Sequence, residues 1–137
     1  MEWPTRFCAT PPLRGARLLL VEDDALLLME LEAILLEAGA EMAGCCRTVR
    51  DALAVAGGGD VDAAILDVRL GRETIAPVAQ RLASRGTPFI FYTGQVENDP
   101  QLAEWTGHRV LSKPARAGAI VAAIAEVLHS APCGRAS

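Results

Sequence analysis

Short apolar segments alternate with segments of helical periodicity along this chain of 137 residues, and five such pairs can be distinguished. This alternation is typical of βαβ units, in which parallel strands are covered by helices on both faces of the sheet. The sequence therefore predicts an α/β domain built around a parallel sheet.

The apolar segments and the capping signals place the expected elements. Strands are predicted at 17–22, 41–46, 63–67, 88–92 and 109–112. Helices are predicted at 24–38, 48–56, 74–84, 100–105 and 117–129. The first and third helices each end at a glycine, and Thr48 is placed to cap the second. Asp99 followed by Pro100 predicts the start of the short fourth helix.

The length of the chain suits one domain, which we expect to occupy residues 16–130. Residues 1–15 hold three of the eight prolines and show no periodicity, and residues 131–137 are small and polar. Both ends are predicted to be flexible tails.

Charge and composition exclude several classes of protein. A net charge of −4 without a basic stripe argues against nucleic-acid binding, because that binding needs clustered Lys and Arg. No apolar stretch is long enough to span a bilayer, and the N-terminus lacks a signal-peptide core. We therefore expect a cytoplasmic protein that binds neither membranes nor nucleic acids.

The four cysteines do not form a CxxC pair, and with only two histidines a structural zinc site is not expected. Cys45 and Cys46 lie in a strand-like apolar segment and are predicted to be buried as small hydrophobic side chains. His108 and His129 are expected to be ordinary surface residues, and Trp105 a buried or partly buried aromatic.

Polar residues lie at the carboxyl ends of four of the predicted strands. They are Glu22, Asp23 and Asp24 at the end of the first strand, Asp67 at the end of the third, Thr93 at the end of the fourth and Lys113 at the end of the fifth. The carboxyl ends of parallel strands meet at one edge of a sheet, where ligands bind in open α/β folds. These side chains are therefore expected to lie together.

A cluster of carboxylates needs a cation, because the acids repel one another and raise each other's pKa. Mg²⁺ meets this need, since it prefers oxygen ligands and completes its coordination with water and phosphate oxygens. An Asp beside such an ion can attack a phosphoryl donor to give an aspartyl phosphate. A lysine and a hydroxyl can donate hydrogen bonds to the phosphoryl oxygens.

Simpler interpretations exist for each part of this cluster. Glu22 and Asp23 alone would be expected only to favour a helix N-terminus, and Thr93 or Lys113 alone could belong to an ordinary turn or surface. A phosphohydrolase with an aspartyl nucleophile would need a second acid two residues later, where this chain has Arg69. A purely structural domain would keep the fold without all of these residues.

Four motifs in this order resemble the receiver domains of bacterial response regulators over about residues 16–130. The motifs are LLLVEDD, AAILDVRL, PFIFYTG and VLSKP, each at the end of a predicted strand. The resemblance implies a flavodoxin-like (βα)5 doubly wound parallel sheet with strand order 2-1-3-4-5. It also implies a phosphoprotein of a two-component phosphorelay that assists its own phosphorylation and dephosphorylation without being a conventional enzyme.

The resemblance also assigns roles to the residues. Asp67 would be the phosphoacceptor, Asp23 a direct Mg²⁺ ligand, and Glu22 a ligand through water. The backbone carbonyl of Arg69 would be a further ligand, and Asp67 itself would also contact the metal. Thr93 and Lys113 would contact the phosphoryl group, and the bond from Lys113 to Pro114 is typically cis. Asp24 is interpreted as a helix cap.

PFIFYTG is similar to the PFxFATG signature of a subgroup of mostly single-domain receivers, with Tyr92 in place of alanine. That similarity implies a sensor histidine kinase, of the HWE type, as phosphodonor and a separate, unidentified protein as downstream target. The protein would be a monomer or a phosphorylation-dependent homodimer.

Two departures from the family concern how phosphorylation is sensed. The Gly71–Thr74 stretch shortens the loop after the third strand, and Val110 stands where most receivers have Tyr or Phe. We therefore expect the signal to travel through Gly94–Thr106, a segment with few apolar residues that would become ordered on phosphorylation. The surface made by the short helix of this segment, the fifth strand and the helix at 117–129 would then be presented to a partner or to a second copy of the chain.

Overall fold

The computed structural model describes residues 11–94, 100–105 and 107–130. Five parallel strands form the central sheet in the order β2-β1-β3-β6-β7. They are β1 (Arg17–Val21), β2 (Glu41–Cys46), β3 (Ala63–Leu66), β6 (Phe89–Thr93) and β7 (Val110–Ser112). Counted along the chain, this is the predicted order 2-1-3-4-5, and the predicted α/β class is confirmed.

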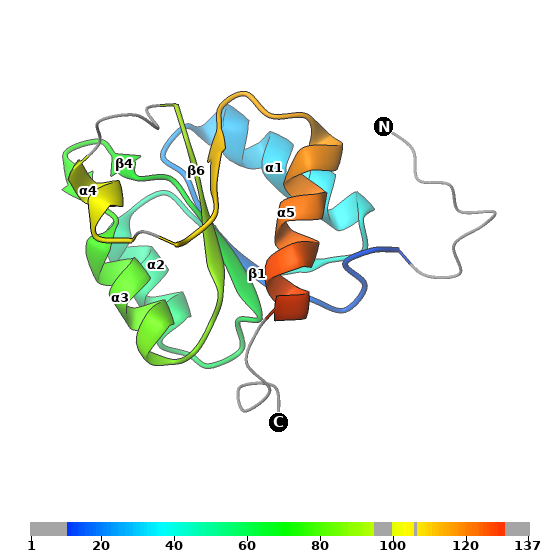
Figure 1. Cartoon of the computed structure of the whole chain (residues 1–137), viewed down its shortest axis with the longest axis horizontal. Helices are drawn as coiled ribbons and strands as arrows, with labels where there is room; N and C mark the ends of the chain where they lie inside the picture. The colour runs from blue at the N-terminus through cyan, green and yellow to red at the C-terminus, as the bar shows by residue number, and fades with distance from the viewer. Residues whose placement is uncertain (1–10, 95–99, 106, 131–137) are drawn as a thin grey trace.

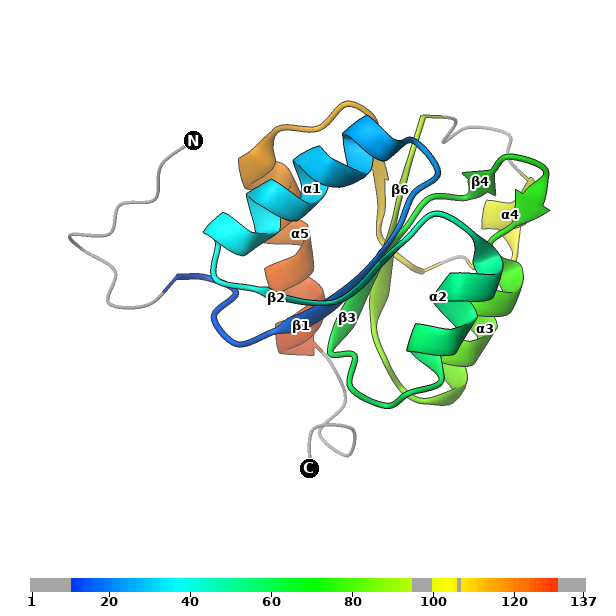
Figure 2. The same ribbon diagram turned by 180° about the vertical axis from the view of Figure 1, so that it is seen from behind.

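Helices cover both faces of the sheet (Figure 1). The layer of α1 (Ala25–Glu37) and α5 (Ala117–Ser130) lies on one face. The other face carries α2 (Val49–Ala56) and α3 (Ala76–Ser84), with the short α4 (Pro100–Ala103) on the same side. The reverse view shows the same two layers on either side of the strands (Figure 2). Within the described residues, no helix is long and apolar enough to cross a membrane.

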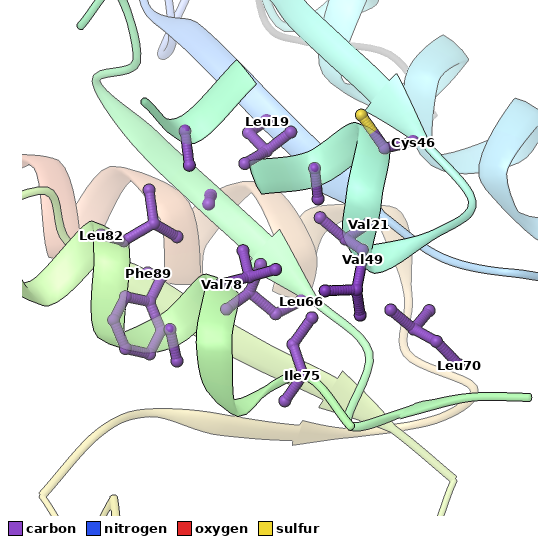
Figure 3. Packing of buried hydrophobic residues seen from close by; sticks show 14 of the residues in the cluster. Leu19, Val21, Cys46, Val49, Leu66, Leu70, Ile75, Val78, Leu82 and Phe89 are labelled. Carbon is purple, nitrogen blue, oxygen red and sulfur yellow. The ribbon is translucent and has the colours of Figure 1, made fainter. Parts of the chain in front are cut away.

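Each strand contributes alternate side chains to two separate apolar cores, because successive residues of a strand point to opposite faces. In β1, Leu19 and Val21 join the core beneath α2 and α3, while Leu18 and Leu20 join the core beneath α1 and α5. Figure 3 shows the first of these cores, in which Leu66, Val78 and Leu82 also lie. The sheet is therefore buried on both faces.

The predicted helix caps at Asp24 and Thr48 are confirmed. The Asp24 carboxylate accepts hydrogen bonds from the N–H groups of Leu26 and Leu27 at 3.0 and 3.1 Å. The Thr48 hydroxyl accepts from the N–H of Asp51 at 3.1 Å. The start expected for the fourth helix at Asp99 lies outside the described residues.

The third helix begins later than predicted. It starts at Ala76 instead of Thr74, because Glu73 and Thr74 form the strand β5 (Glu73–Thr74). This strand pairs antiparallel with β4 (Arg69–Leu70), so that a small hairpin follows β3. The stretch expected to be a shortened loop is therefore a two-stranded hairpin beside the main sheet.

Residues 11–15, expected to belong to the N-terminal tail, pack against the domain. The Leu13 side chain is only 1% exposed, and its N–H donates to the Ala38 carbonyl at 2.9 Å. One isolated leucine among prolines and arginines gives no periodic signal, which explains the wrong boundary. Residues 1–10 and 131–137 lie outside the described residues.

The two neighbouring cysteines have different environments. Cys46 is buried as predicted, but Cys45 is exposed. Cys46 joins the core beneath α2 and α3, whereas Cys45, the preceding residue of the edge strand β2, points to the opposite face of the sheet. The prediction that both thiols are buried was wrong for Cys45.

Candidate functional site

The residues predicted to converge do lie at one edge of the sheet, the upper edge in Figure 1. Glu22 and Asp67 directly follow the paired ends of β1 and β3, where Val21 is opposite Leu66. Thr93 is the last residue of β6 and pairs with Ser112, which precedes Lys113. Parallel pairing of the strands therefore brings four distant parts of the sequence together.

The Lys113 ammonium connects two of the acids. Its Nζ donates to Oε1 of Glu22 at 2.7 Å and to Oδ2 of Asp67 at 3.0 Å. The backbone N–H of Lys113 donates to the Thr93 carbonyl at 2.9 Å, and the Lys113–Pro114 peptide is cis, as expected. One lysine thus contacts the ends of β1, β3 and β6.

Burial gives this ion pair its electrostatic character. Glu22 and Asp67 are 2% and 6% exposed, and Thr93 is 2% exposed. Desolvation raises the pKa of Glu22 to about 7, although the hydrogen bond from Lys113 partly opposes this rise. Burial by itself would lower the pKa of Lys113, but its hydrogen bonds to Glu22 and Asp67 raise it overall. The lysine therefore stays charged between two buried acids.

Asp23 is held by two groups that the sequence did not point to. The N–H of Gly71, in the β4–β5 hairpin, donates to Oδ2 of Asp23 at 3.0 Å. The Arg47 guanidinium donates to the Asp23 backbone carbonyl from Nε and Nη2, at 3.1 and 3.0 Å. Arg47 follows the end of β2. Its position at the carboxyl end of a strand is the one sequence feature that could have placed it near the site.

The hairpin has a second attachment, to α2. Oε1 of Glu73 accepts a hydrogen bond from the N–H of Val49, the first residue of α2, at 3.2 Å. A carboxylate at this position also suits the positive end of the helix dipole. The hairpin therefore bridges Asp23 and the start of α2.

The acids form a set that fits a hard divalent cation. Carboxylate oxygens of Glu22, Asp23 and Asp67 all lie within 4.8 Å of one another. Oxygen-only donors that are partly buried and carry excess negative charge are what Mg²⁺ sites in proteins provide. Arg69 is at the start of the hairpin, where its N–H donates to Oδ1 of Asp67 at 3.3 Å. The metal-binding role of its carbonyl stays a prediction.

The segment Gly94–Thr106 is only partly described, since residues 95–99 and 106 lie outside the described residues. In the part that is described, Leu102 and Trp105 pack against the core beneath α2 and α3. The Trp105 and Phe89 rings meet edge to face at 5.6 Å, as expected of a partly buried aromatic. The premise that this segment has few apolar side chains to bury is thus wrong for Leu102 and Trp105.

His108 is exposed, but it is not an isolated surface residue. Its ring stacks on Phe89 at 4.6 Å with an interplanar angle of 17°, and it meets Trp105 edge to face. Val110 packs against the same core and brings no aromatic ring to β7. The aromatic contacts described on this side of the sheet therefore come from Phe89, Phe91, Trp105 and His108.

A family model for the response regulator receiver domain matches residues 18–125. The chain belongs to this family. It is therefore the receiver domain of a two-component response regulator, as the four motifs predicted. No curated protein matches the sequence significantly.

Solved structures agree with this membership. The receiver is similar to SdrG from Sphingomonas melonis Fr1, with 38% identity, a TM-score of 0.71, and 85% and 98% of the two chains covered. A CheY-like receiver domain protein from Methanospirillum hungatei JF-1 gives 23% identity and a TM-score of 0.74, with 85% and 95% covered.

The response regulator PhyR from Brucella abortus gives 24% identity and a TM-score of 0.72. The match covers 93% of this receiver and 54% of the PhyR chain, so the receiver spans about half the length of that protein. At this identity, the likeness to PhyR shows the fold.

Proposed function

We propose that this receiver takes a phosphoryl group from a sensor histidine kinase onto Asp67 in a Mg²⁺-dependent reaction, and that it acts as a single-domain response regulator. The observation that carries the proposal is the Lys113 ammonium, bonded to both Glu22 and Asp67 beside the Asp23 carboxylate. The site thus holds a nucleophilic carboxylate, a set of hard oxygen ligands and a cation in one place.

In the proposed step, a carboxylate oxygen of Asp67 attacks the phosphorus of the donor. The bond from phosphorus to the donor's leaving atom breaks, the leaving group departs with the electron pair, and an acyl phosphate remains on Asp67. Lys113 donates to a phosphoryl oxygen, and the Thr93 hydroxyl donates to another. The N–H of Arg69 holds the Asp67 side chain in place.

Glu22, Asp23, Asp67 and the Arg69 carbonyl are the groups that would hold Mg²⁺. When bound, the ion supplies positive charge that offsets the charge of the phosphoryl oxygens and of the acids themselves. The Gly71 N–H and the Arg47 guanidinium orient Asp23 for this role. The chain assists its own phosphorylation and dephosphorylation and is not proposed to turn over an external substrate.

The partners follow from the family and from one motif. PFIFYTG, residues 88–94, supports a kinase of the HWE type, because it resembles the signature of receivers paired with such kinases. The downstream target is a protein that distinguishes the phosphorylated from the unphosphorylated surface, with the receiver acting as a monomer or as a phosphorylation-dependent homodimer.

The direct test is incubation with acetyl phosphate and Mg²⁺, followed by intact mass measurement. We expect one phosphoryl group on the native protein and none on Asp67→Asn. Asp24→Asn is the matched control, because this aspartate caps α1 and Asn is an equally good cap. Mg²⁺-dependent labelling of Asp67→Asn at the native stoichiometry would disprove the assignment of Asp67.

Metal binding is tested separately, by following NMR shifts during titration with Mg²⁺. Asp23→Ala is expected to lose most of the binding, since hard-cation sites weaken with each carboxylate removed. Asp24→Asn again serves as the control. An unchanged affinity in Asp23→Ala would place the metal elsewhere.

A further inference from the structure

Tyr92 is a large aromatic residue buried at the border of the candidate site. It is the residue before Thr93 in β6, and it is 3% exposed. Its side chain belongs to the core beneath α1 and α5, on the face of the sheet opposite Phe91. The ring therefore lies inside the domain, one residue away from the phosphoryl-contacting hydroxyl proposed above.

Two contacts join Tyr92 to the loop between β7 and α5. The N–H of Ala115 donates to the Tyr92 hydroxyl at 3.0 Å. The Lys113 ammonium lies over the Tyr92 ring, 5.8 Å from its centroid, within the range of a cation–π interaction. One side chain thus contacts both the backbone of the loop and its charged group.

These contacts matter because a lysine side chain is long and flexible. The Lys113 tip is bonded to Glu22 and Asp67, and its backbone to the Thr93 carbonyl. The Tyr92 ring attracts the ammonium from a further direction, and the Tyr92 hydroxyl fixes the backbone two residues after the lysine. Both anchors come from β6, a strand that is buried along its length.

We propose that Tyr92 is a positioning residue that keeps Lys113 within reach of the group on Asp67 before and after phosphorylation. The inference rests on the proposed role of Lys113. When one Asp67 oxygen becomes bonded to phosphorus, the ammonium has to exchange a carboxylate oxygen for a phosphoryl oxygen. An anchored loop and a ring face restrict this movement to a short displacement, so that less freedom is lost in the transition state.

The simpler alternative is that Tyr92 only fills volume in the core. Three variants separate the two cases. Tyr92→Phe keeps the ring and removes the hydroxyl, and Tyr92→Leu removes both but leaves an apolar side chain. Phe91→Leu is the matched control, because Phe91 is an equally buried aromatic residue in the same strand that faces the other core.

The first measurement is the rate of acyl phosphate formation against acetyl phosphate concentration, with Mg²⁺ present. Tyr92→Leu is expected to lower the maximal rate about three- to tenfold, as the loss of one cation–π contact and one hydrogen bond implies. The concentration for half-maximal rate should change by less than about twofold, because the ring orients the lysine and does not bind the donor. Tyr92→Phe should lie between Tyr92→Leu and the native protein.

The second measurement is amide hydrogen exchange at Ala115 without metal or donor. In Tyr92→Phe and Tyr92→Leu, exchange at Ala115 should become faster than the loss of global stability alone would explain. In Phe91→Leu, any increase should match the loss of global stability. The positioning role is wrong if Tyr92→Leu and Phe91→Leu slow phosphorylation equally and also change the amide exchange rate of Ala115 by the same amount. If the native protein takes up no phosphoryl group, the proposed function fails, whereas Ala115 exchange still decides the Tyr92 contact.

Discussion

Two connections flank Asp67, and they are held in different ways. The β4–β5 hairpin is attached through main-chain N–H donors, from Gly71 to Asp23 and from Val49 to Glu73. The loop after β7 is attached largely through side chains, with the Lys113 ammonium between two buried acids and the Tyr92 hydroxyl beneath the backbone. The hairpin contacts are partly solvated, whereas the lysine neutralises charges that water scarcely reaches.

This difference implies unequal consequences for substitution. A hydrogen bond at an exposed position can be replaced by water, so its loss costs little. A buried carboxylate that loses its cation has no such replacement. We therefore expect the loop after β7 to be sensitive to single changes and the hairpin to tolerate them.

The largest effect is expected from Lys113→Met. We expect the free energy of unfolding at pH 7 without Mg²⁺ to fall by about 2–3 kcal/mol, somewhat less than the ~3–5 kcal/mol typical of broken buried pairs. The smaller loss reflects Glu22, whose pKa near 7 already allows it to take up a proton. Urea unfolding followed by circular dichroism measures this change.

The control for that variant is Arg109→Met. Arg109 and Glu126 form an ion pair with both side chains well exposed, and such pairs contribute about 0–1 kcal/mol. Equal losses in Lys113→Met and Arg109→Met would remove the contrast between the buried lysine and ordinary surface charges.

An intermediate effect is expected from Gly71→Ala in the hairpin. Gly71 has φ of +62°, and an added Cβ would meet nothing within 4 Å, so backbone strain alone should cost about 1 kcal/mol. Gly71→Asn should cost less, because Asn tolerates this conformation better. Thermal unfolding of both variants checks the order.

Gly58→Ala provides the comparison, since Gly58 lies in a turn without positive φ and has room for a methyl group. If Gly58→Ala is as destabilising as Gly71→Ala, the left-handed backbone of Gly71 is not the reason for the loss of stability in Gly71→Ala.

The smallest effect is expected from Glu73→Gln. Gln keeps an acceptor for the Val49 N–H but loses the charge at the start of α2, which is worth about 0.3–1 kcal/mol. Amide exchange at Val49 should be nearly unchanged, with a slight loss of stability in low salt. Glu30→Gln, at an exposed position of α1, serves as the control. A loss as large as that of Lys113→Met would mean that the hairpin is not the tolerant side of the site.

The sequence predicted the sheet and the convergence of the acids because both depend on periodicity and on where strands end. Asp67 and Lys113 are far apart in the chain, yet parallel pairing alone brings their strand ends together. The hairpin could not be predicted in the same way, because strands as short as Arg69–Leu70 and Glu73–Thr74 show no period.

Other features that the sequence did not predict depend on tertiary contacts. Leu13 is buried because it meets the end of α1, and Cys45 is exposed on the face of the edge strand β2 opposite to the core that contains Cys46. In the sequence, Tyr92 differs from its surroundings only as a departure from a motif, since its hydrogen-bond partner Ala115 is 23 residues away. Local patterns carry no information about such partners.

The alternation of side chains along β6 has a mechanical consequence for the whole domain. Phe89 and Phe91 pack into one core, while Ile90 and Tyr92 pack into the other. The strand β6 therefore separates two close-packed cores and contributes side chains to both. Because such interiors compress very little, a shift of β6 toward one face of the sheet would compress one core and loosen the other. A displacement of Thr93 that moves β6 would therefore change the packing against the helices on both sides of the sheet at once.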